Sequence, residues 1–303
     1  MRIAVFGVGG VGGLVGGALA RNHSDIYFYA RGEHLRAIRE NGLSVESYNL
    51  GSFTAHPKLA TDKAEEIGVV DVLFIASKGY DLRGVCKAAS PMAGPNTAVI
   101  PLLNGGPLSE ILEGFLPPCI VADGIIRTHS HIEKPGQIIH ETGGTVVFGM
   151  RDGSRPLLLS ETAALLNTAG IPTTVSEQIL VDCWIKYVSM CGNSTIHCWF
   201  DADTGGVRET PGYETVLQAI WQELVSVAAA KGIILPGNTV ENLVQSYTKA
   251  SPDTITSLYR DLRNGKPAEQ TELFHLIGRI LQFGKETGVP TPYHQAVFEK
   301  YAS

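Results

Sequence analysis

The feature that most constrains this chain is its first stretch, MRIAVFGVGGVGGLVGG, in which a short apolar run gives way to glycines. Seven of the eleven residues from Gly7 to Gly17 are glycine. Each glycine in an ordinary helix costs roughly 1 kcal/mol relative to alanine. So many glycines directly after an apolar run indicate that the fold needs this stretch of backbone to be free of side chains.

The first half of the chain alternates strand-like and helix-like segments. Apolar, β-branched runs predict strands at residues 3–6, 26–29, 69–76, 97–102, 119–122, 144–148 and 171–175. Helical stretches such as residues 33–41 and 108–112 separate them. This alternation predicts right-handed βαβ units and an α/β fold with a mostly parallel sheet.

The second half of the chain has a different pattern. From residue 177 onward, apolar residues recur with a period near 3.6, interrupted by short Pro/Gly breaks. The pattern predicts long helices at residues 178–200, 213–231, 239–249 and 271–287. We therefore expect a parallel-sheet domain over residues 1–176 and an all-helical domain over residues 177–303, with the boundary near Ser176.

The glycines at the start match the spacing GxGxxG at Gly7, Gly9 and Gly12, between a predicted strand and a helix expected over residues 14–21. In a Rossmann-type domain the first glycine permits the tight turn, the second lets a pyrophosphate approach the backbone, and the third lets helix and strand touch. The helix N-terminus then offers free N–H groups to the phosphates. We predict dinucleotide binding here, and interpret Gly13, Gly16 and Gly17 as positions of close packing.

Composition narrows the possible partners. With 303 residues and 44% hydrophobic side chains the chain can bury a large core, and its net charge of −6 without a basic run argues against a nucleic-acid surface. Five cysteines without a CxxC pair predict reduced thiols, and no metal site is indicated. No apolar stretch approaches the ~20 residues of a membrane span, and none has the form of a signal peptide. We expect a cytoplasmic monomer or homodimer that acts on a small molecule.

The end of the second predicted strand indicates which dinucleotide binds. An NAD site usually carries an acidic residue there, but this sequence reads IYFYARGEHL, with Arg31 next to the strand end. A guanidinium suits the 2′-phosphate of NADPH, whereas Glu33 belongs to the first turn of the following helix. Two further strand ends carry Lys78 and Asn104, and ligands bind at the carboxyl ends of parallel strands. We predict that both residues contribute to the cofactor site.

Further segments stand in a characteristic order: MRIAVFGVGGVGG, ARGEHL, VLFIASKGYD, LLNGG, GIIRTHSHIEKPGQIIHETGGTVVFG, DCWIKYVSMCGNST and TSLYRDLRNGKPAEQTEL. In this combination, over nearly its whole length, the chain resembles the ketopantoate reductase family. The resemblance implies an N-terminal Rossmann domain, a C-terminal helical domain and NADPH-dependent reduction of a 2-oxo acid to a 2-hydroxy acid. In the namesake case, ketopantoate is reduced to pantoate for pantothenate synthesis.

The resemblance also implies roles for individual residues. Lys186 matches the catalytic lysine, Glu269 the active-site glutamate, Ser257 a substrate-contacting serine, and Asn104 an asparagine near the nicotinamide and the lysine. Hydride transfer to a carbonyl leaves negative charge on the oxygen, and a proton must follow it. We expect Lys186 to stabilise that charge and donate the proton, and Glu269 to orient the lysine or bind a substrate hydroxyl.

The sequence departs from the family at the positions that hold the substrate. Asparagines four and eight residues after the lysine are replaced by Met190 and Ser194, with Asn193 between them. Asn193 lies near the same helix face as Lys186 and is able to supply one polar contact. These replacements leave the identity of the 2-oxo acid open.

Two alternatives therefore stand beside ketopantoate reduction. One is a related reductase of another branched or apolar 2-oxo acid, which would share every cofactor residue and differ around Met190 and Asn193. The other is a redox-sensing NADP-binding protein without turnover, in which Lys186, Ser257 and Glu269 would have no common purpose.

Overall fold

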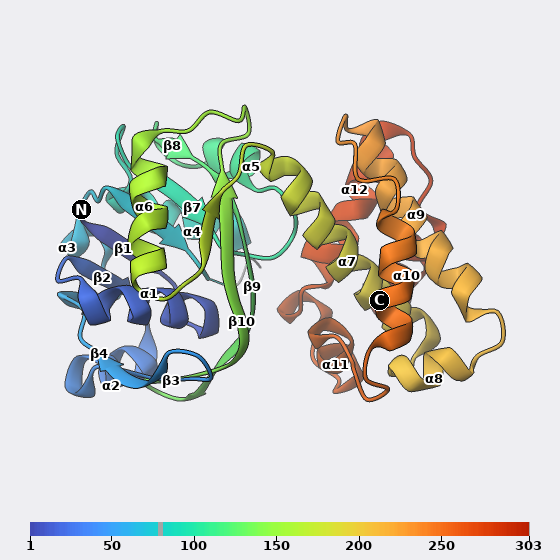
Figure 1. Ribbon diagram of the computed structural model, residues 1–303, viewed down its shortest axis with the longest axis horizontal. Helices are drawn as coiled ribbons and strands as arrows, with labels where there is room; N and C mark the ends of the chain where they lie inside the picture. The colour runs from blue at the N-terminus through green and yellow to red at the C-terminus, as the bar shows by residue number, and fades with distance from the viewer. Residues whose placement is uncertain (78–80, 303) are drawn as a thin grey trace. The chain divides into compact units, whose positions relative to one another are not determined.

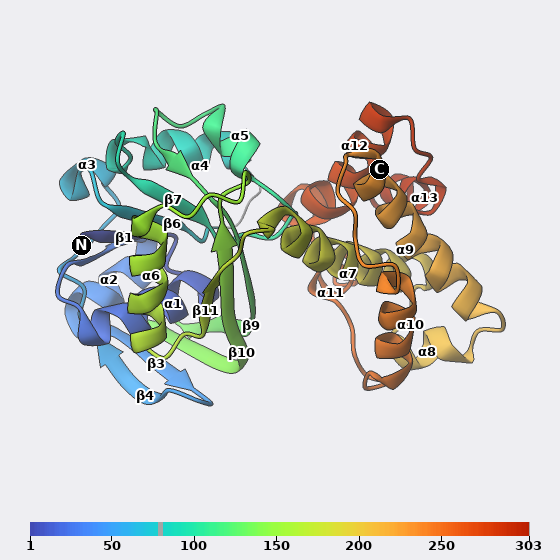
Figure 2. The same ribbon diagram turned by 45° about the horizontal axis from the view of Figure 1, so that its top comes forward.

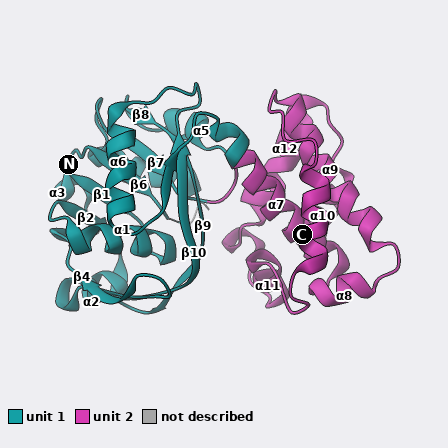
Figure 3. Cartoon of the chain, in the orientation of Figure 1, with its two compact units in different colours: residues 1–103, 107–182 teal, residues 104–106, 183–303 magenta. Residues whose placement is uncertain are grey.

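The computed structural model describes residues 1–77 and 81–302, and the chain divides into two compact units (Figures 1 and 3). Unit 1 comprises residues 1–103 and 107–182, and unit 2 comprises residues 104–106 and 183–303. The division falls between Asp182 and Cys183 rather than near Ser176. It also assigns a three-residue segment of the first half, Asn104–Gly106, to the helical unit.

The centre of unit 1 is a six-stranded sheet in which each strand pairs in parallel with its neighbours. Its order is β5 (Leu59–Thr61), β2 (Ile26–Tyr29), β1 (Ile3–Phe6), β6 (Val72–Ile75), β7 (Ala98–Pro101) and β8 (Ile120–Val121). All residues of β1, β6 and β7 are buried, as expected of strands covered on both faces. The sheet confirms the predicted α/β class, and β1 and β2 have the predicted bounds.

A second sheet in unit 1 is larger than the sequence suggested. It contains β11 (Thr173–Val175), β10 (Gln137–Gly149), β3 (Leu43–Ser47) and β4 (Gly51–Ala55), with β9 (Asp123–Lys134) paired antiparallel to β10. The prediction covered part of β10 and β11 but missed the hairpins β3–β4 and β9–β10. In β3 and β10 buried residues alternate with more exposed ones over much of the strand, and β9 is buried only over its first four residues, so neither hairpin has the continuous apolar runs of the parallel sheet.

Helices cover the sheets of unit 1 (Figures 1 and 2). They are α1 (Gly10–Asn22), α2 (Gly32–Asn41), α3 (Ala64–Ile67), α4 (Leu82–Ala89), the 3-10 turn η2 (Ser90–Met92), α5 (Ser109–Glu113) and α6 (Leu157–Thr168). Helix α1 begins four residues earlier than predicted, at Gly10 rather than at residue 14. It packs against α6 and against strands of both sheets.

The glycines of α1 allow this close approach to both sheets. A Cβ at Gly16 would lie 2.7 Å from the Phe28 ring of β2, in the parallel sheet. At Gly13 it would lie 2.6 Å from Ile138 of β10, and at Gly17 it would lie 2.9 Å from Val45 of β3. These distances confirm that Gly13, Gly16 and Gly17 are positions of close packing.

Unit 2 is helical, as predicted. Its elements are α7 (Ile179–Phe200, from Cys183 onward), α8 (Thr204–Glu209), α9 (Tyr213–Ala230), α10 (Thr239–Lys249), α11 (Ser257–Arg263), the 3-10 turn η3 (Ala268–Gln270), the π-helix η4 (Phe274–Gly278), α12 (Arg279–Thr287) and α13 (Pro292–Ala302). The helix expected at residues 271–287 is therefore a π-helix followed by α12, and α13 was not predicted. No helix in the described ranges is long and apolar enough to cross a membrane.

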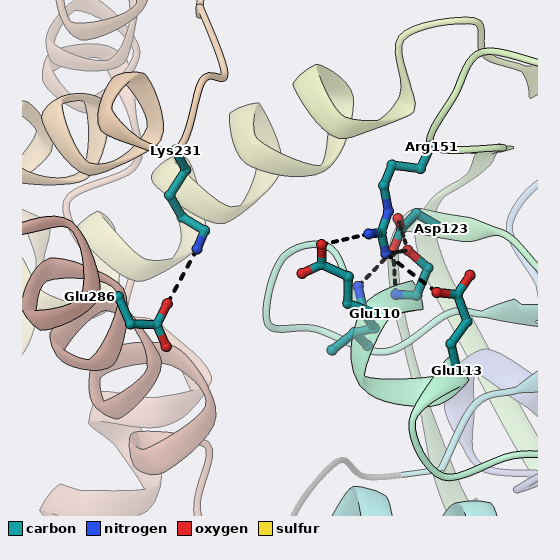
Figure 4. Close-up of polar contacts among 8 residues, drawn as sticks. Glu110, Glu113, Asp123, Arg151, Lys231 and Glu286 are labelled. Atoms are coloured by element: carbon teal, nitrogen blue, oxygen red, sulfur yellow. Dashed lines mark hydrogen bonds and ion pairs between the residues drawn. The ribbon is translucent and has the colours of Figure 1, made fainter.

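Helices α7, α9 and α12 pack tightly in unit 2. Gly192 of α7 faces Trp221 of α9 so closely that a Cβ there would lie 2.2 Å from the indole ring. At the end of α9, Lys231 Nζ lies 3.3 Å from Glu286 Oε2 of α12 (Figure 4). The Lys231 ammonium also lies over the Phe283 ring, 4.4 Å from its centroid.

We expect alanine at Gly12 to destabilise the protein and alanine at Gly9 to leave its stability nearly unchanged. A Cβ at Gly12 would lie 2.1 Å from the Gly7 carbonyl oxygen, whereas a Cβ at Gly9 has no heavy atom within 4 Å. Gly12→Ala should lower the free energy of unfolding by about 1–3 kcal/mol through overpacking. Gly9→Ala should change it by less than about 0.5 kcal/mol. Denaturant unfolding of both variants measures this, and equal destabilisation would contradict the packing argument.

Candidate active site

The turn between β1 and α1 has the geometry of a phosphate-binding loop. Gly7 has a φ of +93°, and a Cβ there would lie 2.7 Å from the backbone nitrogen of Ser77. Gly9 precedes α1 without a side-chain cap, and no acidic residue stands in the first turn of the helix. The first N–H groups of α1 are thus available to an anion, and the space beside Gly9 is open for its approach. These features fit the pyrophosphate of a dinucleotide.

Arg31, the residue predicted to contact a 2′-phosphate, lies just after the end of β2. It is exposed, follows β2 by two residues and occupies the N-cap position of α2. Glu33 lies in the first turn of α2 and pairs at 3.1 Å with Arg36 on the exposed surface of the same helix. The acidic residue near the strand end therefore has a role in its own helix, and Arg31 is the charged group directly after the strand. Lys78, the other predicted cation of this site, lies outside the described residues.

In unit 2 three polar side chains form a hydrogen-bonded chain. Lys186 Nζ on α7 donates to Asn104 Oδ1 at 3.0 Å, and Asn104 Nδ2 donates to Glu272 Oε1 at 3.0 Å. Asn104 follows the last residue of β7 by three positions, so the segment that leaves the parallel sheet supplies the central member. The structure thus brings together two of the predicted residues, Lys186 and Asn104, with a carboxylate that was not predicted.

The carboxylate that holds Asn104 belongs to Glu272, whereas the sequence analysis singled out Glu269, three residues earlier. Glu269 is exposed in the 3-10 turn η3, whereas Glu272 is half-buried and holds the Asn104 amide. Helical periodicity offered a signal for Glu272. It precedes the buried residues Leu276 and Ile280 by one and two helical turns, which places it on the packed side of its helix.

The backbone around Glu272 and Asn104 is anchored to α7. The Leu276 carbonyl of the π-helix accepts hydrogen bonds from the Tyr187 hydroxyl at 2.7 Å and from the Cys191 thiol at 3.5 Å. Burial raises the pKa of both groups, so both remain protonated donors. Arg279 donates to the Gly105 carbonyl, which ties the Asn104 segment to the start of α12. Lys186 therefore lies on α7 itself. Its partner Glu272 is held to α7 through the π-helix backbone, and Asn104 is held through Gly105 to the start of α12.

The residues after this segment are held by a buried carboxylate in unit 1 (Figure 4). Asp123 is 0% exposed and accepts the backbone N–H groups of Leu108 at 2.6 Å and Ser109 at 2.9 Å. Its other oxygen accepts the Ser109 hydroxyl at 2.5 Å, and Arg151 donates to the same hydroxyl at 2.7 Å. The sequence analysis did not single out Asp123, because a lone aspartate after a short strand carries no motif.

The residues predicted to hold the substrate lie in different environments. Met190 and Asn193 are half-buried on α7, while Ser194 is only 3% exposed. Ser257 is exposed as the first residue of α11. Asn193 lines a pocket in unit 2, so it is the polar residue among these four that a ligand in that pocket would meet.

These features define a class of protein: a dinucleotide-binding domain joined to a helical domain in which a lysine is hydrogen-bonded through an asparagine to a glutamate. Comparison with known proteins identifies the family. The profile of the family described as ketopantoate reductase PanE/ApbA matches residues 3–153, and that of its C-terminal domain matches residues 178–302. The chain belongs to the ketopantoate reductase family and is a nicotinamide-dependent oxidoreductase.

Individual relatives agree with this assignment. The chain is 27% identical to a 2-dehydropantoate 2-reductase of Halobacterium salinarum, over 96% of this chain and 95% of that protein. A solved structure of 2-dehydropantoate 2-reductase from Porphyromonas gingivalis has 27% identity and a TM-score of 0.85, covering 100% of this chain and 99% of that one. A D-mandelate dehydrogenase solved with NADH and anilino(oxo)acetate shares the fold, with a TM-score of 0.85, 23% identity, and 99% and 96% coverage.

The two glutamates are expected to differ in their effect on turnover. Glu272→Gln keeps the shape of the side chain but removes the charge that orients the Asn104 amide, and kcat should fall about 10- to 100-fold. Glu269→Gln is the matched control, and it should change kcat less than about twofold because Glu269 is exposed in η3. Steady-state kinetics of both variants decide between the residues. A large loss in Glu269→Gln with normal turnover in Glu272→Gln would return the role to Glu269.

Proposed function

We propose that this protein uses NADPH to reduce a 2-oxo acid to a 2-hydroxy acid, with ketopantoate as the first candidate substrate. The observation that carries the proposal is the hydrogen-bonded chain from Lys186 through Asn104 to Glu272. It places an ammonium group in an ordered position, as the acid of a carbonyl reduction requires. A role in pantothenate synthesis in the cytoplasm would follow from that substrate.

The amide of Asn104 has a defined orientation in this chain. A carboxylate only accepts hydrogen bonds and a lysine ammonium only donates them. Glu272 therefore selects the NH₂ end of the amide, and the oxygen of Asn104 is left to face Lys186. Flipping the amide would place donor against donor and acceptor against acceptor, so the two ends of the chain determine the position of the lysine nitrogen.

The proposed chemistry uses this order. When bound, the reduced nicotinamide supplies the hydride that adds to the carbonyl carbon of the 2-oxo acid. Lys186 hydrogen-bonds the carbonyl oxygen, stabilises the negative charge that grows there and gives it a proton. Asn104 holds the lysine nitrogen in place during that transfer, and the Glu272 carboxylate holds Asn104.

The NADPH preference rests on Arg31 and the phosphate loop. Arg31 supplies a positive charge directly after β2, where an acidic residue would otherwise hold the ribose hydroxyl of NADH. The open N-terminus of α1 and the glycines at 7, 9 and 12 provide backbone N–H groups for the pyrophosphate. Two separate parts of unit 1 thus fit two separate phosphate groups of the same cofactor.

Two 2-oxo acid substrates have to be distinguished. Relatives named 2-dehydropantoate 2-reductase support ketopantoate. Met190 favours the second candidate, a branched or apolar 2-oxo acid, because a thioether cannot donate a hydrogen bond to a substrate hydroxyl. A redox sensor without turnover is disfavoured, since it would have no use for the ordered lysine.

Replacing Lys186 tests the proposed acid. Lys186→Ala should lower kcat about 10²- to 10⁴-fold, the usual contribution of positioned proton transfer, and should leave the Kd for NADPH close to that of the wild type. The matched control is Lys231→Ala, which removes a lysine of the same unit that pairs with Glu286. Stopped-flow reduction and cofactor titration measure both effects. A Lys186→Ala enzyme with most of its turnover intact would rule out this role.

Replacing Arg31 tests the cofactor preference. Loss of a charge-assisted hydrogen bond is worth about 1.5–3 kcal/mol, so Arg31→Ala should weaken NADPH binding roughly 10- to 150-fold. The Kd for NADH should stay nearly unchanged, because NADH has no 2′-phosphate. Arg36→Ala on the same helix is the control, as Arg36 pairs with Glu33 on the surface. Equal weakening of both cofactors would show that Arg31 does not recognise the 2′-phosphate.

A further inference from the structure

The segment Asn104–Gly106 carries the central amide of the lysine site, yet its own backbone prefers no single conformation. It belongs to no helix or strand. Its last two residues are glycines with φ angles of +118° at Gly105 and +83° at Gly106. Glycine backbone has more conformational freedom than that of any other residue. The position of the Asn104 amide therefore depends on the contacts that the segment makes in unit 2.

The chain around the π-helix η4 attaches to this segment at two points. Asn104 Nδ2 donates to Glu272 Oε1 at 3.0 Å, which holds the end of the asparagine side chain. Arg279, seven residues after Glu272, donates from its guanidinium to the carbonyl oxygen of Gly105. The first contact holds the amide itself, and the second holds the backbone beside it. Together they restrict Asn104 more than the side-chain contact would alone.

The guanidinium of Arg279 lies on an aromatic support. Its Cζ atom is 5.0 Å from the centroid of the Phe283 ring, about one turn further along α12. The Phe283 ring in turn lies 5.7 Å from the ring of Trp184, a residue of α7 that is only 2% exposed. A cation is attracted to the face of an aromatic ring at this distance. Arg279 therefore donates to the segment from a position that the packing of α7 and α12 defines.

The two glycines of the segment lie close to the groups that hold it. A Cβ at Gly105 would lie 3.5 Å from the carbonyl oxygen of His275 and 3.6 Å from Nη1 of Arg279. A Cβ at Gly106 would lie 3.4 Å from the ring of Tyr187 on α7. The segment thus packs against α7 and against the junction of the π-helix and α12.

We propose that Arg279 is a positioning residue for the reduction, and that it acts by holding the backbone next to Asn104. The proposal rests on the reduction proposed above. The effect passes from the Gly105 carbonyl to the Asn104 amide, and from the amide to Lys186 Nζ through the 3.0 Å hydrogen bond. Arginine suits this role because its guanidinium stays charged and presents its donors in a rigid plane. Without it, the glycine backbone gains freedom and the lysine nitrogen moves with the amide.

The first test replaces Arg279 by methionine, which keeps an apolar stem over Phe283 but removes the hydrogen-bond donors. For ketopantoate, or for 3-methyl-2-oxobutanoate if the wild type reduces that acid faster, kcat should fall roughly 10- to 100-fold. A misplacement of a reacting group by about 1 Å has an effect of this size. KM should change less than about twofold, because an acid that acts in the transition state contributes mainly to kcat.

Lys231→Met is the matched control. The Lys231 ammonium lies over the same Phe283 ring, 4.4 Å from its centroid, but its ion pair is with Glu286 on α12. This variant also loses a cation from the ring, and it should keep kcat within about twofold of the wild type, as expected of a residue away from the site. An equal loss of kcat in both variants would assign the effect to the aromatic support and overturn the proposal.

A double-mutant cycle with Asn104→Ala tests whether Arg279 acts through the amide. In the Asn104→Ala enzyme there is no amide left to position, so Arg279→Met should lower kcat further by less than about twofold. An effect through the charge of Arg279 or through general loss of stability would persist in that background. Losses of kcat that multiply in the double variant would therefore rule out the positioning role.

Hydrogen exchange of the Asn104 side-chain amide separates this proposal from the proposed reduction. Its NMR signals in ¹⁵N-labelled enzyme are those missing from Asn104→Ala, and in Arg279→Met they should exchange at least about 10-fold faster through local opening. Lys231→Met should leave the exchange unchanged. If the wild type reduces neither acid but Arg279→Met accelerates the exchange, the reduction is wrong and the hold of Arg279 on Asn104 stands. If Arg279→Met keeps both the exchange rate and the kcat of the wild type, the proposal fails and the reduction stands.

Discussion

The close packing of α1 between the two sheets is the contact on which the rest of unit 1 depends. Glycines allow the helix backbone to lie against Phe28 on one side and against Val45 and Ile138 on the other. Because the second sheet is built on the opposite side of the helix, larger side chains would push the sheets apart. The same geometry brings the N-terminus of α1 to the end of β1 with its N–H groups uncovered. Core packing and phosphate binding thus require glycine for related reasons.

In unit 2, the lysine site depends on a single asparagine side chain. One asparagine amide joins an ammonium and a carboxylate, and each of the three groups makes the hydrogen bond that its chemistry permits. The surrounding backbone is held by Tyr187 and Cys191, one and five residues after Lys186 on the same helix. Since α7 carries both Lys186 and these two donors, one helix sets the positions of the lysine and of the backbone next to Glu272.

Sequence patterns predicted the parallel sheet well because buried strands such as β1 and β2 are continuous apolar runs. The hairpins β3–β4 and β9–β10 were missed because their strands contain many polar residues and no long apolar run, and because β9–β10 contains register shifts. Lys186 and Asn104 were predicted, but their pairing depends on a fold that joins residues 82 positions apart. The contact of Glu272 with Asn104 was not predicted, because the sequence does not show how the helix that begins near Glu272 packs.

The assignment of Asn104–Gly106 to the helical unit bears on how proteins of this architecture can change over evolution. A fragment beginning at Cys183 would contain Lys186 and Glu272 but not the amide that joins them. The two units are therefore not independent modules, even though each has its own core. A chimaera that combines the sheet unit of one reductase with the helical unit of another must take the LLNGG segment from the same protein as the helices. Recombination between Asp182 and Cys183 would separate residues that have to be inherited together.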